Sequence, residues 1–218
     1  MTLKQTYQTD TDSIASYDWV DLQDGTGNVI YYLAWTEDST GEDQIITRLT
    51  PYSSEIETNL AVSDGEKFTD GARYTHDYDV LYNIAATSNG KVLINAGLKV
   101  TGNAAETSSA YWTFELVHVT EAGAETVKGI VQTATYSVTT GTEYYVTHLG
   151  FDVSDVHFAQ KEKARLRVKL YTSGAGSGGV GSAAYGHDPQ NRDGTTIPPS
   201  SEDVITNTYV VIPYKLDT

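Results

Sequence analysis

The chain has 218 residues, of which 29 are acidic and 14 are basic, so its formal net charge is −15. A negative field of this kind repels phosphate backbones, which argues against nucleic acid as a partner. The absence of cysteine excludes disulfides and thiolate metal sites. No segment approaches the roughly 20 apolar residues that cross a bilayer, and residues 1–13 lack the apolar core of a signal peptide. We therefore expect a soluble protein, made in the cytoplasm, with no membrane partner.

The composition also favours strands over helices. Tyrosine occurs 16 times and glycine 19 times, against four phenylalanines and one methionine. Long runs of the strong helix formers Leu, Ala, Glu and Lys are missing, whereas Val and Thr are plentiful. The balance predicts many short strands joined by turns.

The first third of the chain is the least regular. Residues 1–15 are polar and aperiodic, and we expect a flexible or docking arm there. Residues 16–22 and 28–36 flank two glycines and predict a hairpin, and residues 43–49 follow a second turn, STGE. Residues 50–77 have weak periodicity and predict a long connection with at most short strands.

Strong alternation begins at residue 78. The pattern predicts a hairpin of residues 78–87 and 91–100 across Ser88-Asn89-Gly90, since Asn-Gly is typical of primed turns. Further strands are expected at 111–119, 126–138, 143–153, 164–171 and 204–216, with turns at EAGAE and TTGT. Pro213 cannot donate a ladder hydrogen bond, which predicts an edge or a bulge at that point. The side chains expected to point inward are Val92, Ile94, Ala96, Leu98, Val100, Trp112, Phe114, Leu116, His118, Leu166, Val168, Leu170, Val210, Ile212, Tyr214 and Leu216.

About ten closely spaced strands without an amphipathic helix predict an all-β fold. We expect an antiparallel β-sandwich of the jelly-roll type. Residues 1–60 would form an N-terminal arm and hairpin region for docking or subunit contact, and residues 61–218 the sandwich itself.

The run AYGHDPQNRDG (184–194) gathers the most chemistry-bearing residues. His187, Asp188 and Arg192 could belong to a metal site, a catalytic loop or a turn. A metal site needs further ligands at a fixed spacing, which His148 and His157 do not provide. An Asp before a Pro is restricted to extended geometry and commonly caps a turn. We interpret the run as a turn at the rim of the sandwich, with a calcium ion or a subunit contact as the alternatives.

Other candidate catalytic motifs are incomplete. The glycine-rich run SGAGSGGVG (173–181) lacks the Lys-Ser/Thr pair of a phosphate loop, and it is interpreted as a hairpin tip. Asp152, Asp155 and His157 have no nucleophile elbow to accompany them. Glu115 and Glu143 lie on predicted strands without the pairing of a glycosidase. We expect neither an enzyme nor a bound cofactor.

Two patterns instead predict contacts with other proteins. Arg165, Arg167 and Lys169 form a basic row on one strand face. Such a row suits a solvated sheet, or a carboxylate-rich patch on a neighbouring subunit with which arginine forms bidentate pairs. Tyr31 and Trp35 lie on a strand rich in aromatic residues, which are favoured at protein contacts.

Several of these segments together resemble a known class of proteins. The text YYLAWTEDSTGEDQIITRLTPYSSEIETN, the strands from residue 78 onward, and KARLRVKLYTSGAGSGGVGSAAYGHDPQNRDG before TYVVIPYKL resemble head-decoration and related accessory structural proteins of tailed viruses. The resemblance implies a jelly-roll subunit, often trimeric, that binds an icosahedral shell and stabilises it. Its partners would be the major capsid protein or other virion proteins, and its location the virion, assembled in the host cytoplasm.

A second function remains open, because a jelly roll also suits a carbohydrate- or receptor-binding module of a tail, fibre or spike. Trp35, Trp112 or Tyr144 would stack on sugar rings, with calcium near Asp188 or Asp193.

Overall fold

The computed structural model describes residues 15–16, 26–38, 41–47, 57–104, 106–176, 180–187 and 208–216. These residues form 13 strands and one short 3₁₀ helix. Within them, no helix is long and apolar enough to cross a membrane. The elements are β1 (Ala15–Ser16), β2 (Thr26–Asp38), β3 (Gly41–Thr47), β4 (Glu57–Ser63), η1 (Phe68–Asp70), β5 (Tyr74–Leu81), β6 (Ala86–Gly102), β7 (Glu106–Val119), β8 (Glu125–Gln132), β9 (Tyr136–Val138), β10 (Gly141–Phe158), β11 (Lys163–Gly176), β12 (Val180–Gly186) and β13 (Tyr209–Leu216).

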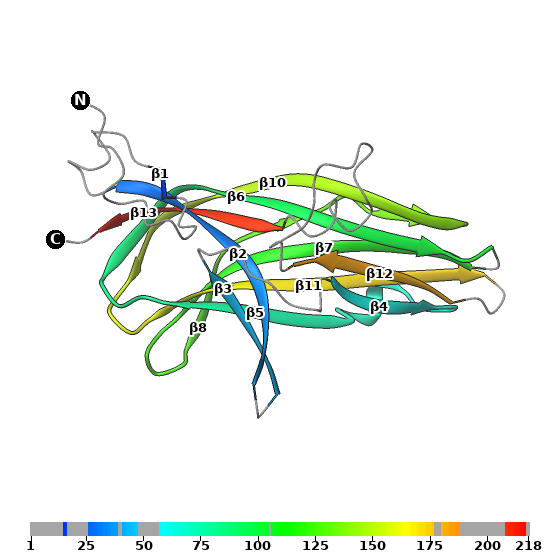
Figure 1. Cartoon of the computed structure of the whole chain (residues 1–218), viewed down its shortest axis with the longest axis horizontal. Coiled ribbons are helices and arrows are strands. Elements are labelled where there is room, and N and C mark those ends of the chain that lie inside the picture. The colour runs from blue at the N-terminus through cyan, green and yellow to red at the C-terminus, as the bar shows by residue number, and fades with distance from the viewer. Residues whose placement is uncertain are drawn as a thin grey trace.

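Eight of these strands pair in a nested order. The innermost pair is β7 with β8, followed outward by β6 with β10, β5 with β11, and β4 with β12, and all four pairs are antiparallel. Folding such a nested ribbon over itself gives two four-stranded sheets. One sheet has the order β4-β12-β6-β10 and the other β5-β11-β7-β8. The predicted antiparallel β-sandwich of the jelly-roll type is therefore confirmed (Figure 1).

Three further strands extend the first sheet. One edge of β6 pairs with β10 over nearly its whole length, while the other edge is shared between β12 and β13. Through β13 the sheet continues to β2 and β3, and β3 reaches the second sheet at a single parallel bridge, Ile45 to Asp79. The hairpin of β2 and β3 projects away from the sandwich (Figure 1). The division expected at residue 60 stays a prediction.

The hydrophobic core lies between the two sheets. Alternate residues of β6, β7 and β11 point inward, as the sequence pattern predicts. Trp112, Phe114 and Leu116 of β7 have no exposed surface, and neither have Leu166, Val168 and Leu170 of β11. The inward residues of β6 are equally buried, so β6, β7 and β11 together supply half of the core cluster.

The predicted turn at Ser88-Asn89-Gly90 is wrong. Strand β6 runs straight through these residues, and the preceding strand β5 lies in the other sheet. Both kinds of primed hairpin turn need positive φ at the first central residue, and of the Asn-Gly pair only the second residue, Gly90, has it, at 125°. The neighbouring strand β10 instead contains a bulge between Val153 and Val156, where Asp155 has φ 48° and accepts a hydrogen bond from Asn89. The Asn-Gly pair therefore accommodates a bulge.

Two other expectations need correction. The run 173–181 is not a hairpin tip, because its described residues belong to the end of β11 and the start of β12, which lie in different sheets. The stretch 50–77, expected as a long connection with at most short strands, contributes the seven-residue β4, an outer strand of the roll, as well as the start of β5. Weak periodicity here fits a strand in which, among residues 59–63, only Val62 is buried.

The predicted turns at EAGAE and TTGT are present, with Gly123 and Gly141 at positive φ. Of the predicted first hairpin, only Ala15 and Ser16 are seen to pair with β2. The prediction for Pro213 is also confirmed. It lies within β13 at a register shift against β6, where no ladder hydrogen bond is required of it. The hydroxyl of Ser88 donates to the Pro213 carbonyl oxygen at 2.7 Å, which satisfies that carbonyl beside the irregular pairing.

Candidate functional site

The predicted basic row lies on the outer face of the second sheet. Strand β11 pairs with β5 on one side and β7 on the other, so Arg165 stands beside Asp79 and Arg167 beside Asp77. Each arginine binds its aspartate with two hydrogen bonds. The Nε and Nη2 atoms of Arg165 donate to Asp79 at 2.6 and 2.9 Å, and those of Arg167 to Asp77 at 2.6 and 2.7 Å.

Strand β8 adds a carboxylate that joins the two arginines. Glu125 accepts hydrogen bonds from both Arg165 and Arg167, and the two guanidinium groups reach it across β7. The intervening residue of β7, Val117, has no exposed surface although it points away from the core. The ion pairs therefore also cover apolar surface, as long arginine stems commonly do.

The ionisation of these groups is strongly coupled. Burial opposes ionisation of Asp79, but hydrogen bonds from Arg165 and Lys163 outweigh it and lower the pKa of that carboxyl. Hydrogen bonds to Asp77 in turn raise the pKa of Arg167. The arginine side chains are only 17% and 18% exposed, so these pairs are screened less by solvent than ordinary surface pairs.

The same face continues to Lys169, which donates to Glu115 Oε1 at 2.6 Å. The other carboxylate oxygen of Glu115 is buried without a hydrogen-bond partner, as is the hydroxyl of Thr113. Lys163, Arg165, Arg167 and Lys169 are thus balanced by Asp77, Asp79, Glu115 and Glu125 of the same chain. The sequence left two surroundings open for this row, a solvated sheet and a carboxylate-rich patch on a neighbouring subunit. The structure adds carboxylates from the chain's own strands β5, β7 and β8. A subunit contact at this row stays a prediction.

The predicted contact residue His187 is fully buried, which leaves no surface for the subunit contact expected of it. It follows β12, whose Tyr185 belongs to a buried cluster between the sheets. The Tyr185 hydroxyl is hydrogen-bonded to His76 Nδ1 at 2.9 Å and to the Tyr78 hydroxyl. Burial, with His187 as a second cause, lowers the pKa of His76 to about 4. The cluster joins β5 to β12 and therefore serves packing. Asp188 and Arg192 lie outside the described residues.

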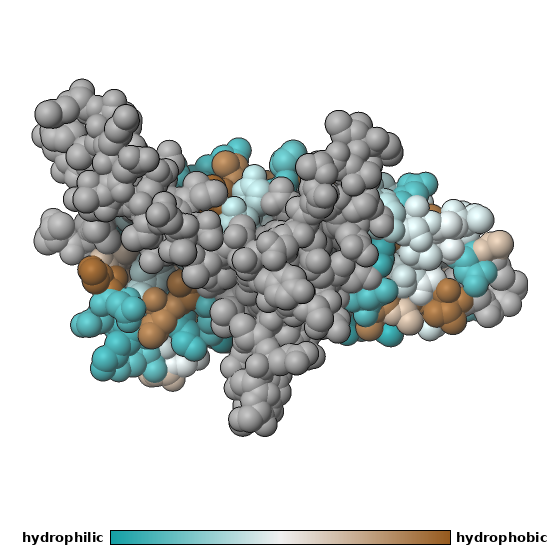
Figure 2. Space-filling view, in the orientation of Figure 1, coloured by the Kyte–Doolittle hydropathy of each residue, from teal (hydrophilic) through white to brown (hydrophobic). Residues whose placement is uncertain are grey.

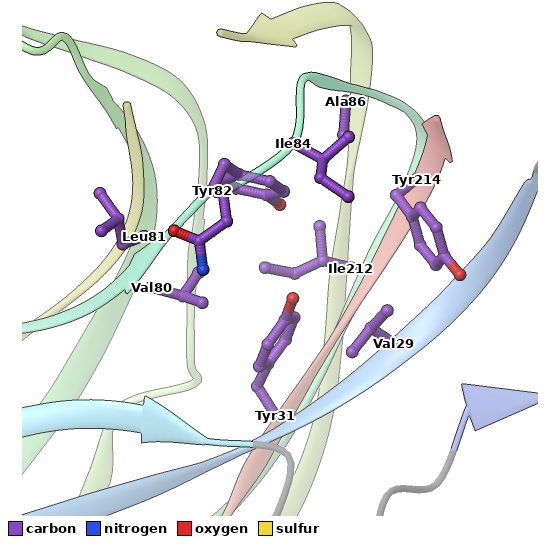
Figure 3. Close-up of a pocket in the computed structure, with 10 residues that line it drawn as sticks. Val29, Tyr31, Val80, Leu81, Tyr82, Ile84, Ala86, Ile212 and Tyr214 are labelled. Carbon is purple, nitrogen blue, oxygen red and sulfur yellow. The ribbon is translucent and has the colours of Figure 1, made fainter. Parts of the chain in front are cut away.

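Tyr31 is 8% exposed and lines a pocket of about 330 Å³ at one end of the sandwich (Figure 3). For Trp35 only the backbone is described, in register with Gln44 of β3. Trp112, a candidate sugar platform, is instead buried in the core with its Nε1 donating to the Tyr74 hydroxyl at 3.4 Å. Tyr144 is 38% exposed on β10.

The other acidic and histidine residues considered from the sequence are dispersed. Asp155 accepts a hydrogen bond from the Asn89 side chain, and His157 Nδ1 lies 3.5 Å from the Thr87 hydroxyl oxygen. Both contacts are on the exposed surface. In the part of the chain that the structure describes, no three histidine, cysteine or acidic residues lie close enough to hold a metal ion.

One apolar surface was not expected from the sequence. Strands β8 and β10 lie at the same side of the sandwich, and Phe151 of β10 packs on Gly129 of β8 so closely that a Cβ at that glycine would be 2.2 Å from the ring. Beside this contact, apolar side chains of both strands are between 38% and 54% exposed, on the outer faces of the two sheets. Val127 and Ile130 of β8 stand beside Val117 and Glu115 on the second sheet, and Tyr144 and Val146 of β10 stand beside Lys99 and Gly97 on the first. We call these two patches, which lie at the same side of the sandwich, the β8–β10 surface. On the face seen in Figure 2, apolar residues likewise form small groups between hydrophilic ones.

Comparison with known proteins identifies a fold but no family. No family model and no curated protein matches the chain. Among solved structures, the chain is similar to an aminopeptidase from a marine sediment Thaumarchaeota archaeon, with a TM-score of 0.50 and 8% identity over 85% of this chain and 36% of the aminopeptidase. A CocE/NonD family hydrolase from Staphylococcus aureus has a TM-score of 0.49 and 9% identity, over 88% of this chain and 37% of the hydrolase.

The chain is also matched to a structure of infectious bursal disease virus, with a TM-score of 0.27 and 11% identity over 85% of this chain and 42% of the viral chain. The chain spans little more than a third of the two hydrolases. The similarity to the aminopeptidase, at 8% identity, shows the fold alone. The resemblance to head-decoration proteins stays a prediction.

Proposed function

We propose that the chain is a structural protein of a virion, which decorates the capsid shell and stabilises it through protein contacts. It acts by binding rather than by catalysis, as a homo-oligomer for which a trimer is favoured. The sequence resemblance described above and the jelly-roll fold agree with this role. Because a fold alone does not define a function, the proposal depends chiefly on the surfaces of the molecule.

The observation that carries the proposal is the β8–β10 surface. In the described part of the chain, β10 pairs only with β6 and β8 only with β7, so both present an open edge. Natural proteins protect long sheet edges with charges, prolines or short strands. The 18-residue strand β10 has its aspartates Asp152 and Asp155 and its bulge towards one end. Tyr144 and Val146 lie exposed towards the other end, where Glu143 is the one acidic residue. Another protein that packs on this side would remove that surface from water.

The ion-paired face of the second sheet supports the same role. Its charges are neutralised within the chain, so this face needs no counter-charges from a partner. A subunit that stabilises a shell needs a rigid body with a restricted contact surface. Preorganisation of this kind lowers the entropic cost of binding.

The proposal is tested with the purified chain and empty shells assembled from the major head protein that the same genome encodes. The chain should co-sediment with the shells at a saturating ratio and raise their thermal disassembly temperature. Light scattering after size exclusion should show an oligomer. A Val146→Asp variant should lose shell binding, because it places a charge on the contact surface.

The matched control is Thr75→Asp, an exposed strand residue on the opposite sheet, which should bind as the parent does. A chain that remains monomeric at every concentration and never co-sediments with shells would contradict the proposal.

A further inference from the structure

A pocket lies where β2 and β13 meet the connection between β5 and β6. Val29 and Tyr31 of β2, with Ile212 and Tyr214 of β13, form one wall (Figure 3). The opposite wall comes from the end of β5 and the residues that follow it, and the pocket volume is about 330 Å³. The remaining lining residues are Val80, Leu81, Tyr82, Asn83, Ile84 and Ala86.

The floor and walls of this pocket are built into the sandwich. Ile212 is 1% exposed and belongs to the main core. The backbone of Tyr82 is held on both sides, because its N–H donates to the Glu162 carbonyl at 2.9 Å and its carbonyl accepts from Lys161 at 2.8 Å. The Tyr82 ring stacks on Phe158 at a centroid distance of 4.7 Å. The pocket is therefore preformed, and a ligand would not have to order it.

The rim, in contrast, exposes apolar surface. Ile84 is 65% exposed and Leu81 is 50% exposed, whereas the leucines of the core are fully buried. Each square ångström of apolar surface removed from water contributes about 25 cal/mol. A ligand that fills the pocket and covers these two side chains would gain that contribution at little conformational cost.

The lining also defines the chemistry of the ligand. None of the ten lining residues is charged, although the chain as a whole has 29 acidic and 14 basic residues. Burial and the neighbouring Tyr31 hydroxyl raise the pKa of Tyr82, so the Tyr82 phenol stays neutral. An ion placed here would lose its hydration without a counter-charge. The pocket therefore selects against charged ligands.

The size and the tyrosines favour a ring over an alkyl chain. A dry cavity of about 150 Å³ suffices for benzene, so this pocket has room for a two-ring system. Tyr31, Tyr82 and Tyr214 offer ring edges and faces for aromatic packing, and a tyrosine oxygen can accept a hydrogen bond from an indole N–H. Aromatic side chains inserted into such pockets are the usual anchors of protein interfaces.

We infer that this pocket is a docking site for an aromatic side chain, tryptophan in the first place, presented by a partner protein. The inference goes beyond the proposed function, since the pocket would serve an anchor from a shell protein or from any other partner. It concerns a surface at the β2–β13 end of the molecule, separate from the β8–β10 surface.

The test is a titration of the ¹⁵N-labelled full chain with N-acetyl-tryptophanamide, followed by amide chemical shifts. Saturable shifts are expected at Ile84, Ala86 and Tyr214. The variant Ile84→Asp should weaken binding by at least about tenfold, because a carboxylate on the rim would be desolvated by the ring. The matched control Val180→Asp, at a valine that is 58% exposed at the start of β12, should bind within about twofold of the parent.

Leu81→Asp is a second rim variant, to be used if Ile84→Asp does not fold, and it should show the same loss. Three outcomes would overturn the inference: no saturable shift in the parent, equal binding by parent and rim variants, or binding of N-acetyl-leucinamide as tight as that of the tryptophan derivative. The titration uses no shells, so its result does not depend on whether the chain binds them. The shell-binding experiment, in turn, does not depend on the pocket.

Discussion

The ion-paired face of the second sheet and the pocket at the β2–β13 end differ in how far the chain completes them. On the face, Arg165 and Arg167 are the most conspicuous residues of the sequence, yet their hydrogen-bonding groups are occupied by Asp77, Asp79 and Glu125. At the pocket, an inconspicuous isoleucine, Ile84, is left 65% exposed beside a preformed hollow. A surface is therefore available to a partner where apolar side chains stay exposed, and not simply where charged residues gather.

The comparison is sharpened most by truncating the floor of the pocket. Ile212→Ala should lower the free energy of unfolding by about 2–4 kcal/mol, because it leaves a cavity in the main core. Ile84→Ala on the rim of the same pocket should change it by less than about 0.5 kcal/mol. Urea denaturation followed by circular dichroism measures both. Equal losses in the two variants would show that the rim is not the open surface described above.

The second test breaks the ion-paired face. Arg165→Ala should cost about 2 kcal/mol, since it removes two hydrogen bonds from Asp79 and one from Glu125 and uncovers Val117. Lys161→Ala removes a pair with Glu121 in which both side chains are 66% exposed. That control should cost less than about 0.5 kcal/mol. The same denaturation experiment compares them, and a similar cost for both would mean that the face is an ordinary solvated surface.

A third prediction concerns acid. The pKa of His76 in the folded chain is about 4, against about 6.5 for an unperturbed histidine. Between these values the unfolded chain binds a proton that the folded chain does not, so stability should fall as the pH drops from about 6.5 to about 4. His76→Gln should flatten the fall in the urea midpoint over this range. An unchanged slope in the variant would show that His76 does not control it.

The smallest effect on stability is expected at the β8–β10 surface. Ile130→Ser and Val146→Ser, at side chains 54% and 50% exposed, should each change the free energy of unfolding by less than about 0.5 kcal/mol. Both should nevertheless reduce oligomerisation, as measured by light scattering. A variant that unfolds readily would show that these side chains support the fold of the single chain.

The sequence predicts the sandwich well because one rule, alternation, decides most of it. The pleat of a strand points successive side chains to opposite faces. In β11 it therefore directs the apolar side chains inward and the basic ones outward: Leu166, Val168 and Leu170 against Arg165, Arg167 and Lys169. The order of the strands is not contained in that rule. A periodic strand shows which face is buried, but not which strand lies beside it.

The candidate site was harder to predict for the same reason. Asp77 and Asp79 also alternate, in the segment YTHDYDV, and their spacing matches that of Arg165 and Arg167 in an antiparallel register. Pairing the two patterns would have placed the carboxylates on the same chain. Ile84 offered no such signal, because it lies within a predicted strand that the structure divides between two sheets.

The nested order of strand pairs has a consequence for how the chain folds. The β7–β8 pair closes through a five-residue turn, while the outermost pair joins Glu57 to Gly186. Each pair outward closes a larger loop and so costs more chain entropy before its contacts form. Such high contact order predicts slow folding, in milliseconds to seconds, as in other all-β proteins. During synthesis, β4 and β5 leave the ribosome well before their partners β12 and β11. Until those partners are made, the backbone groups at the edges of β4 and β5 are unpaired and prone to aggregation.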